Sequence, residues 1–338
     1  MTALTEPLSR PAPRRGRPGW LVVAEKEFGD HVTSIRFVVL LLILAAAVAP
    51  PLYFASGTIR DLASQVSGQP AVFLALFTLA PQDQTLPGIL RFDVFVGLLA
   101  PLLGIAFGFD AVNVERTERT LPRLVAQPIH RDDVINGKFA AGLSTIALML
   151  AALTVLVAGF GIFRLGIVPS ASEVVRLVVW YVLTIIYVGF WLAFATLLSV
   201  ALRRAAASAL IAFGTWFFFM VFWSVVATLA ATLLSPAGAT PESVLGNATF
   251  EQTISRLSPA TLYQEAALVL LNPVAGSTTI SVPGSLAAYI QAQQQISSLH
   301  SLDQSLLLVW PQLVGLVALT VIAFAASYVL FMRQEVRA

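Results

Sequence analysis

Long uncharged apolar runs dominate the chain, and short charged stretches separate them. A membrane-spanning helix needs about 20 apolar residues, and a helix satisfies its own backbone hydrogen bonds in lipid. Six runs meet this description, the second being the shortest and extending back through Arg91 and Asp93 toward the interface. The sequence therefore predicts an all-α membrane protein with six transmembrane helices. The expected spans cover residues 37–55, 91–110, 138–163, 176–202, 205–234 and 306–332.

The segments between spans predict smaller helical pieces outside the membrane. Residues 56–90 and 236–304 are expected to be extracytoplasmic. Within the first, Ala71 to Ala80 is apolar but too short to span, so we expect it to be interfacial or re-entrant. Within the second, apolar residues recur at helical spacing between Leu286 and Leu299, with several glutamines between them. This pattern is typical of an amphipathic helix on the membrane or of a small external cap.

The chain begins with a polar region before the first span. Residues 1–18 are rich in proline and arginine and are expected to form a disordered basic tail. In residues 19–36, apolar positions such as Leu21, Ala24 and Phe28 recur at spacings of three and four, which indicates an amphipathic helix. This helix either lies along the inner leaflet as an elbow before the membrane, or is a cytoplasmic extension of span one. Its central residues are Glu25, Lys26, Glu27 and Phe28.

Composition and charge support the membrane interpretation and orient it. The chain is 57% hydrophobic and only 11% charged, against about 25% charged in soluble domains. With the N-terminus inside, fifteen of the twenty Lys and Arg residues fall on the cytoplasmic side, as the positive-inside rule requires. We therefore expect a multi-pass protein of the plasma (inner) membrane with both termini in the cytoplasm. The net charge of +2 follows this sidedness and does not indicate nucleic-acid binding.

The cytoplasmic loop of residues 111–137, between spans two and three, is the most charged part of the chain. Leu121 and Leu124 lie at helical spacing, and Pro128 ends that helix. Asp132 then suits the start of the next helix, where the helix dipole favours negative charge. A short helix with an apolar stripe and charged flanks is suited to docking on another protein. The alternative is an ordinary positive-inside loop.

Several motifs in and around this loop resemble the ABC type-2 (exporter-like) permease family. The family pattern is roughly E-x-x-x-G-T-L, then P-[IV]-x-R, then G-K at the next helix. Arg119 stands where the family usually has glycine, so the local geometry of the loop can differ. The matching stretches are Glu115–Leu121, Gln127–Arg131 and Gly137–Phe139, with further likeness at Glu25–Phe28, Ser258–Tyr263 and Phe331–Arg337.

The resemblance implies partners and roles for these residues. In that family two permease chains pair, and each contacts a separate cytoplasmic ABC ATPase, which binds ATP and Mg²⁺. This chain is thus expected to be a homodimeric, non-catalytic subunit that binds no cofactor itself and couples ATP hydrolysis to transport, with export as the expected direction. The loop helix is implied to act as a coupling helix in a groove of the ATPase. The implied interface residues are Glu115, Glu118, Thr120, Leu121, Arg123, Leu124, Gln127, Pro128 and Arg131.

Motifs for catalysis or nucleotide binding are missing from the sequence. A P-loop around Gly137 and Lys138 would need glycine at Asp132 and a hydroxyl residue at Phe139. The chain has no cysteine, and its three histidines show no metal-binding spacing. Gly104 and Gly108 form a GxxxG spacing, which favours close helix packing.

Two other functions stay open at this point. One is a mechanical role, in which ATP-driven motion is passed to an extracytoplasmic partner by the external segments. The other is a secondary carrier, which the absence of ionisable residues deep within the spans disfavours.

Overall fold

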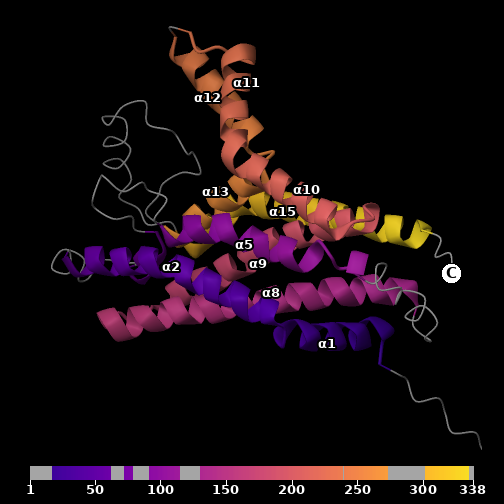
Figure 1. The fold of residues 1–338 in the computed structure, drawn as a ribbon. Coiled ribbons are helices and arrows are strands. Elements are labelled where there is room, and N and C mark those ends of the chain that lie inside the picture. Colours follow the sequence, from indigo (N-terminus) through magenta and orange to yellow (C-terminus); the bar gives the residue numbers. More distant parts are fainter. Residues whose placement is uncertain are drawn as a thin grey trace, which may run out of the picture.

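The computed structural model describes residues 17–61, 72–78, 91–114, 130–238, 240–272 and 301–334. Within these residues the ordered elements are all helices, and most run along one common direction as a bundle (Figure 1). The helices are α1 (Gly19–Val32), α2 (Ile35–Asp61), α4 (Val72–Thr78), α5 (Phe92–Gly108), α8 (Arg131–Leu165), α9 (Ala171–Ala201), α10 (Ala205–Phe217), the π-helical turn η2 (Phe218–Phe222), α11 (Trp223–Leu234), α12 (Pro241–Ser255), α13 (Pro259–Leu271) and α15 (Leu302–Arg333).

Five of the expected spans correspond to helices that are long and apolar enough to cross a membrane. They are α2, α8, α9, the continuous run from α10 through η2 to α11, and α15. The second expected span is α5, which is apolar but has only 17 residues. At 1.5 Å per residue its length is about 25 Å, slightly short of the hydrocarbon core. The all-helical membrane fold is thus confirmed, and the count of six spans stays a prediction.

The region before the first span forms a helix of its own. α1 ends at Val32, and α2 begins at Ile35 after a two-residue break. The hydroxyl of Ser34 accepts a hydrogen bond from the Phe37 amide at 3.2 Å, so Ser34 satisfies a free donor at the start of α2. The helix is thus interrupted at Thr33–Ser34, between α1 and α2. Whether α1 lies along a membrane surface stays a prediction.

Helix α9 is the centre of the bundle. Over half of its most apolar window, 56%, is buried, the largest share among the five long spans. The fully buried Trp180, Tyr187 and Trp191 project from it into the main core. Helices α5, α8, α13 and α15 all pack against it. Its start is closed by a capping box in which Ser170 and Glu173 satisfy each other's backbone amides.

The two glycines of the GxxxG spacing lie where α5 crosses α9. A Cβ atom at Gly104 would lie 2.6 Å from the Val188 carbonyl oxygen, and one at Gly108 would lie 2.8 Å from the Leu192 carbonyl oxygen. No side chain fits at these distances, because the obstructing atoms belong to the backbone. Glycine therefore sets how closely α5 and α9 approach within one chain.

The fifth span departs from the bundle. In Figure 1, α10 runs beside the other helices, and α11 then rises away from them as an arm on which α12 folds back. The π-helical turn η2 interrupts the regular helix between the two parts. Only 11% of the most apolar window of this span is buried within the chain. Large side chains such as Leu210, Leu229 and Leu233 are left exposed on it.

Two short helices from the segments predicted to lie outside the membrane are buried in the core of the bundle. The side chains of Phe73, Leu74 and Phe77 on α4 are at most 1% exposed. α13 buries Tyr263, whose ring stacks on Tyr187 of α9 at a centroid distance of 4.4 Å. The interfacial or re-entrant prediction for residues 71–80 is compatible with a helix buried at one end of the bundle. The external cap predicted for residues 286–299, and the tail of residues 1–16, lie outside the described residues.

Candidate coupling site

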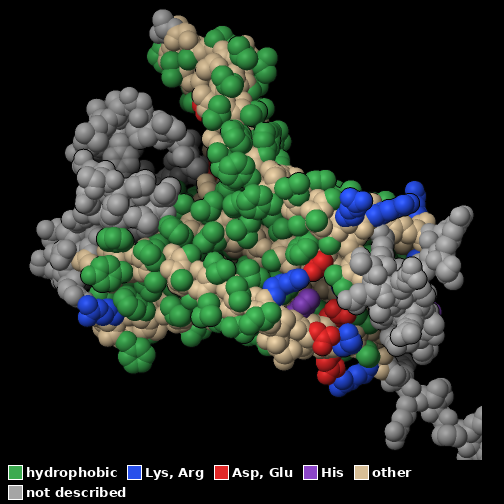
Figure 2. All heavy atoms as spheres, in the orientation of Figure 1, with side chains coloured by type: hydrophobic (Ala, Val, Ile, Leu, Met, Phe, Trp, Pro, Cys, Tyr) green, Lys and Arg blue, Asp and Glu red, His purple; other side chains and the backbone are tan. Residues whose placement is uncertain are grey.

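One end of the bundle gathers charged side chains on the face shown in Figure 2. We call it the charged end, and it consists of α1, the start of α8, and the last turns of α5, α9 and α15 (Figure 1). The residues on either side of the predicted coupling helix, Val114 and His130, belong to it. Eight predicted interface residues lie outside the described residues: Glu115, Glu118, Thr120, Leu121, Arg123, Leu124, Gln127 and Pro128. Arg131 is described, and it opens α8.

The chain entering this loop is held by α9 and α2. The amides of Val112 and Asn113 both donate to the hydroxyl of Ser199, at 3.1 and 3.2 Å, and Ser199 is completely buried. Just before them, the Arg36 guanidinium forms a two-pronged pair with the Asp110 carboxylate, at 2.6 and 3.2 Å. Such bidentate pairs fix direction as well as distance. The end of α5 is thus tied to two neighbouring helices.

The chain leaving the loop is held by the end of α15. Arg131 donates to the Gln334 carbonyl oxygen at 2.9 Å, and its guanidinium lies 5.7 Å from the centre of the Phe331 ring. The Gln334 side chain in turn donates to the Val200 carbonyl oxygen at 2.8 Å. The structure therefore connects Arg131, one of the predicted interface residues, to the ends of both α15 and α9.

Helix α1 is seated on the first turns of α8. The Trp20 amide, a free donor at the start of α1, donates to the Asp133 carboxylate at 3.0 Å. Two turns along, Lys138 and Glu27 form an ion pair at 3.2 Å, with side chains only 10% and 16% exposed. Between them Gly137 allows close contact, since a Cβ there would lie 2.7 Å from the Trp20 carbonyl oxygen. We call these contacts the α1 seat.

The four predicted elbow residues have different environments. Glu27 belongs to the α1 seat and Phe28 is half-buried. Glu25 and Lys26 are exposed, and they pair with Arg17 and Asp30 respectively, each at 2.9 Å. The Asp30 hydrogen bond raises the pKa of Lys26, so that amine stays charged at neutral pH.

His31 completes the contact between α1 and the bundle. Its ring meets Phe107 of α5 edge-on at a centroid distance of 5.1 Å. Burial lowers the pKa of His31 below its ordinary value, which keeps the imidazole neutral at neutral pH. The packed face of α1 is therefore made by Val23, Glu27 and His31. Part of the apolar stripe expected from the sequence remains open, with Leu21 39% exposed.

The opposite end of the bundle holds buried ionisable residues that the sequence pattern did not reveal. Arg176 of α9 is 4% exposed and donates to the Ser305 hydroxyl at 2.9 Å. Glu173 is also buried, and its carboxylate accepts the Phe73 amide at 2.9 Å, which connects α9 to α4. Glu265 of α13 is 1% exposed. Glu173 and Arg176 precede an apolar run and Glu265 lies in a mixed segment, so hydropathy alone does not separate them from exposed charges.

The contacts at the charged end connect several helices to one another. Helix ends and the two flanks of one loop are tied together by directional hydrogen bonds and ion pairs. Among the described residues no group of three or more His, Cys, Asp or Glu side chains is placed to hold a metal ion.

Comparison with known proteins identifies the family. The model of the ABC-2 family transporter proteins matches residues 21–336. The chain belongs to this family. As an ABC-2 permease, it is the membrane subunit of an ABC transporter. It is also similar to the probable ABC transporter permease protein NosY of Stutzerimonas stutzeri, with 31% identity over 151 residues. That match covers 43% of this chain and 52% of the relative, so it spans about half of the relative's length.

Proposed function

We propose that this ABC-2 permease couples ATP hydrolysis on a separate cytoplasmic ATPase subunit to transport across the membrane, with export as the direction. The observation that carries the proposal is the anchoring of both flanks of the predicted coupling helix at the charged end. A helix that receives force must be tied to the elements it moves. Val112 and Asn113 provide this connection on one side, and Arg131 provides it on the other.

The contacts suggest how the motion is passed on. A displacement of the loop pulls on α8 through its first turn and on α9 through Ser199. Because α1 is seated on α8 by Asp133 and Lys138, the two helices move together. Packed helices shift as rigid bodies between discrete arrangements, so ATP binding on the partner biases a two-state membrane domain. ATP and Mg²⁺ belong to the ATPase in this scheme, and this chain performs no catalysis.

The proposed orientation places the charged end in the cytoplasm. The start of α1 and the end of α15 lie at this end (Figure 1), so the two termini share one side. A reporter enzyme that is active only outside the inner membrane is expected to be inactive when fused after Ala338. The same reporter inserted at position 239, between α11 and α12, is expected to be active. The reverse pattern would show that the topology is inverted.

The proposal is tested first by purifying the tagged chain in mild detergent and identifying co-purifying proteins by mass spectrometry. We expect an ATPase with a P-loop in stoichiometric amount, because the sequence of this chain shows no P-loop motif and ATP must therefore bind to another subunit. A monodisperse permease that brings no ATPase with it would contradict the coupling function. The same preparation gives the mass of the complex, which reports the number of permease copies.

A second copy of the chain is the proposed cover for the fifth span. Its apolar face is the least buried of the long spans. Membrane lipids cover whatever part of this face the second copy leaves open. Membership of the ABC-2 family does not favour the alternative function of a secondary carrier.

A further inference from the structure

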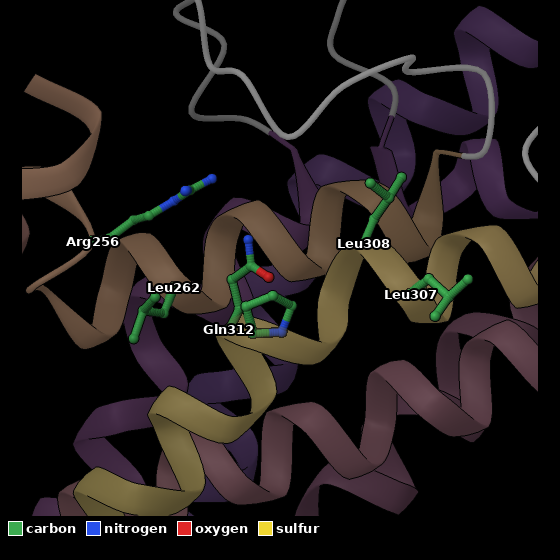
Figure 3. Close-up of a pocket in the computed structure, with 6 residues that line it drawn as sticks. Arg256, Leu262, Leu307, Leu308 and Gln312 are labelled. Atoms are coloured by element: carbon green, nitrogen blue, oxygen red, sulfur yellow. The ribbon is translucent and has the colours of Figure 1, made fainter. Parts of the chain in front are cut away.

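A pocket of about 350 Å³ opens at the opposite end of the bundle from the α1 seat. It lies where α13 and α15 meet, next to the turn that joins α12 to α13 (Figure 3). The pocket is lined by Arg256, Leu262, Leu307, Leu308, Pro311 and Gln312. It has no part in the coupling contacts described above.

One corner of the pocket is polar and is built around a buried carboxylate. The Nε atom of Arg256 donates to both oxygens of Glu265, at 2.9 and 3.2 Å. The Gln312 amide donates to the same carboxylate at 3.0 Å. Because Glu265 is only 1% exposed and its partners hold it in place, it fixes the direction of the guanidinium.

This arrangement leaves hydrogen-bonding groups unused. Glu265 accepts only from the Nε of Arg256, and the two terminal nitrogens of the guanidinium donate to no acceptor among the described residues. The Arg256 side chain is 38% exposed, which leaves these nitrogens accessible. Among the described residues, Oε1 of Gln312 has no hydrogen-bond donor although it is buried. Only a donor, such as a hydroxyl of a ligand headgroup, satisfies this acceptor, and an oxyanion does not.

The rest of the pocket is apolar and opens onto the surface of the bundle. Leu262 is nearly buried, Leu308 is half-buried, and Leu307 is 73% exposed. Pro311 completes this wall. Figure 3 shows Arg256 reaching the pocket from the end of α12, while Gln312 and Leu308 reach it from α15. The polar corner and the apolar wall therefore face a common space.

The position of the pocket along α15 suits a molecule with a polar headgroup and an apolar tail. α15 has 32 residues, so at 1.5 Å per residue it is about 48 Å long and extends beyond a hydrocarbon core of about 30 Å. Gln312 lies about 15 Å from the start of the helix. With α15 centred on the core, about 9 Å of the helix projects at each end, so Gln312 lies about 6 Å, roughly one helical turn, inside the hydrocarbon boundary.

We propose that this pocket binds an amphipathic anion, with a phosphate or carboxylate headgroup on the terminal nitrogens of Arg256. Its apolar chain lies along Leu262, Leu307, Leu308 and Pro311. Arg256 is suited to this role because a planar guanidinium recognises such oxyanions with two parallel hydrogen bonds. The site goes beyond the coupling function, and its binding can be measured without the ATPase, so either proposal can fail alone.

Binding is tested on the purified full-length permease by native mass spectrometry. The probes are phosphatidylglycerol, phosphatidylcholine with the same acyl chains, and inorganic phosphate. We expect phosphatidylglycerol to bind about tenfold more tightly than phosphatidylcholine, the usual effect of one charge-assisted contact. Inorganic phosphate is expected to bind at least tenfold more weakly than phosphatidylglycerol, because it lacks the apolar chain. Phosphate binding as tight as that of the lipid would overturn the amphipathic class.

Two variants and one matched control locate the site. The double variant Arg256→Gln with Glu265→Gln removes the cation and the buried carboxylate together, and is expected to abolish the preference for phosphatidylglycerol. Leu308→Trp fills the pocket without touching the ion pair, and is expected to weaken binding about tenfold. Arg164→Gln, at the exposed end of α8, is expected to change neither value. A preference for phosphatidylglycerol that survives in the folded double variant overturns the site, and so does undiminished binding to folded Leu308→Trp, which decides the matter if the double variant does not fold.

Discussion

Leu121→Asp is expected to abolish co-purification of the ATPase while the permease still inserts into the membrane and folds. The reason is that Leu121 and Leu124 form the apolar stripe of the predicted coupling helix, and a docking groove buries such side chains. A carboxylate placed there loses its hydration without gaining a partner. Central interface residues of this kind contribute about 2–4 kcal/mol, which is enough to dissociate a complex during purification.

The control for this experiment is Leu245→Asp on α12. Leu245 is 68% exposed, and α12 folds back on the arm far from the charged end (Figure 1). This variant adds the same charge without affecting the docking helix, so the ATPase should still co-purify. If the ATPase is retained by Leu121→Asp as fully as by the control, the loop does not dock through its apolar stripe, and the alternative of an ordinary positive-inside loop is correct.

The second large effect is expected for Gly137→Ala in the α1 seat. The added Cβ would lie 2.6 Å from the Val23 Cβ and 2.7 Å from the Trp20 carbonyl oxygen. Relief of the clash requires α1 to move away from α8, which weakens the Trp20–Asp133 hydrogen bond and the Glu27–Lys138 ion pair. Overpacking of this size costs about 1–3 kcal/mol. We therefore expect a lower melting temperature in detergent and faster hydrogen exchange along α1.

The matched control is Gly29→Ala on the exposed side of α1. A Cβ at Gly29 meets no other atom within 4 Å, so the change only removes backbone freedom from a helix. Stability is expected to stay constant or to rise by about 0.5–1 kcal/mol. Equal melting temperatures for the two variants would show that α1 does not depend on close contact with Gly137.

Gly137→Ala also separates docking of the ATPase from transmission of its motion to the membrane helices. Gly137 lies within α8, which begins at Arg131 although the sequence predicted the loop to extend to residue 137, and the docking residues stay unchanged. Gly137→Ala is therefore expected to retain the ATPase but to reduce the coupling between ATP hydrolysis and transport. Loss of the ATPase from this variant, once folding is verified, would mean that the α1 seat contributes directly to the docking surface.

The pattern of hydrophobic and polar residues along the chain determined which segments form apolar helices. The apolar runs predicted the five long apolar helices and α5, because the hydropathy of a segment depends on its own side chains. The bounds differ in places, since α2 continues to Asp61 beyond the expected residue 55 and α8 begins at Arg131 before the expected residue 138. The break at Ser34 and the opening of α8 near Asp132 also follow from local backbone chemistry. The family motifs around Gly137 indicated a permease, and the comparison with known families confirms this.

Contacts between segments far apart in the sequence decided which helix faces and which polar groups are buried. Nothing in the pattern of α1 shows that Val23, Glu27 and His31 form its packed face, since the complementary groups belong to α8 and α5. α13 has mixed polarity, yet its Glu265 is buried because Arg256 and Gln312 satisfy the carboxylate. The sequence by itself determined which segments are helical and apolar. Only the tertiary structure decided which polar groups are buried, because a charge can leave water only where partners from other helices are brought to it.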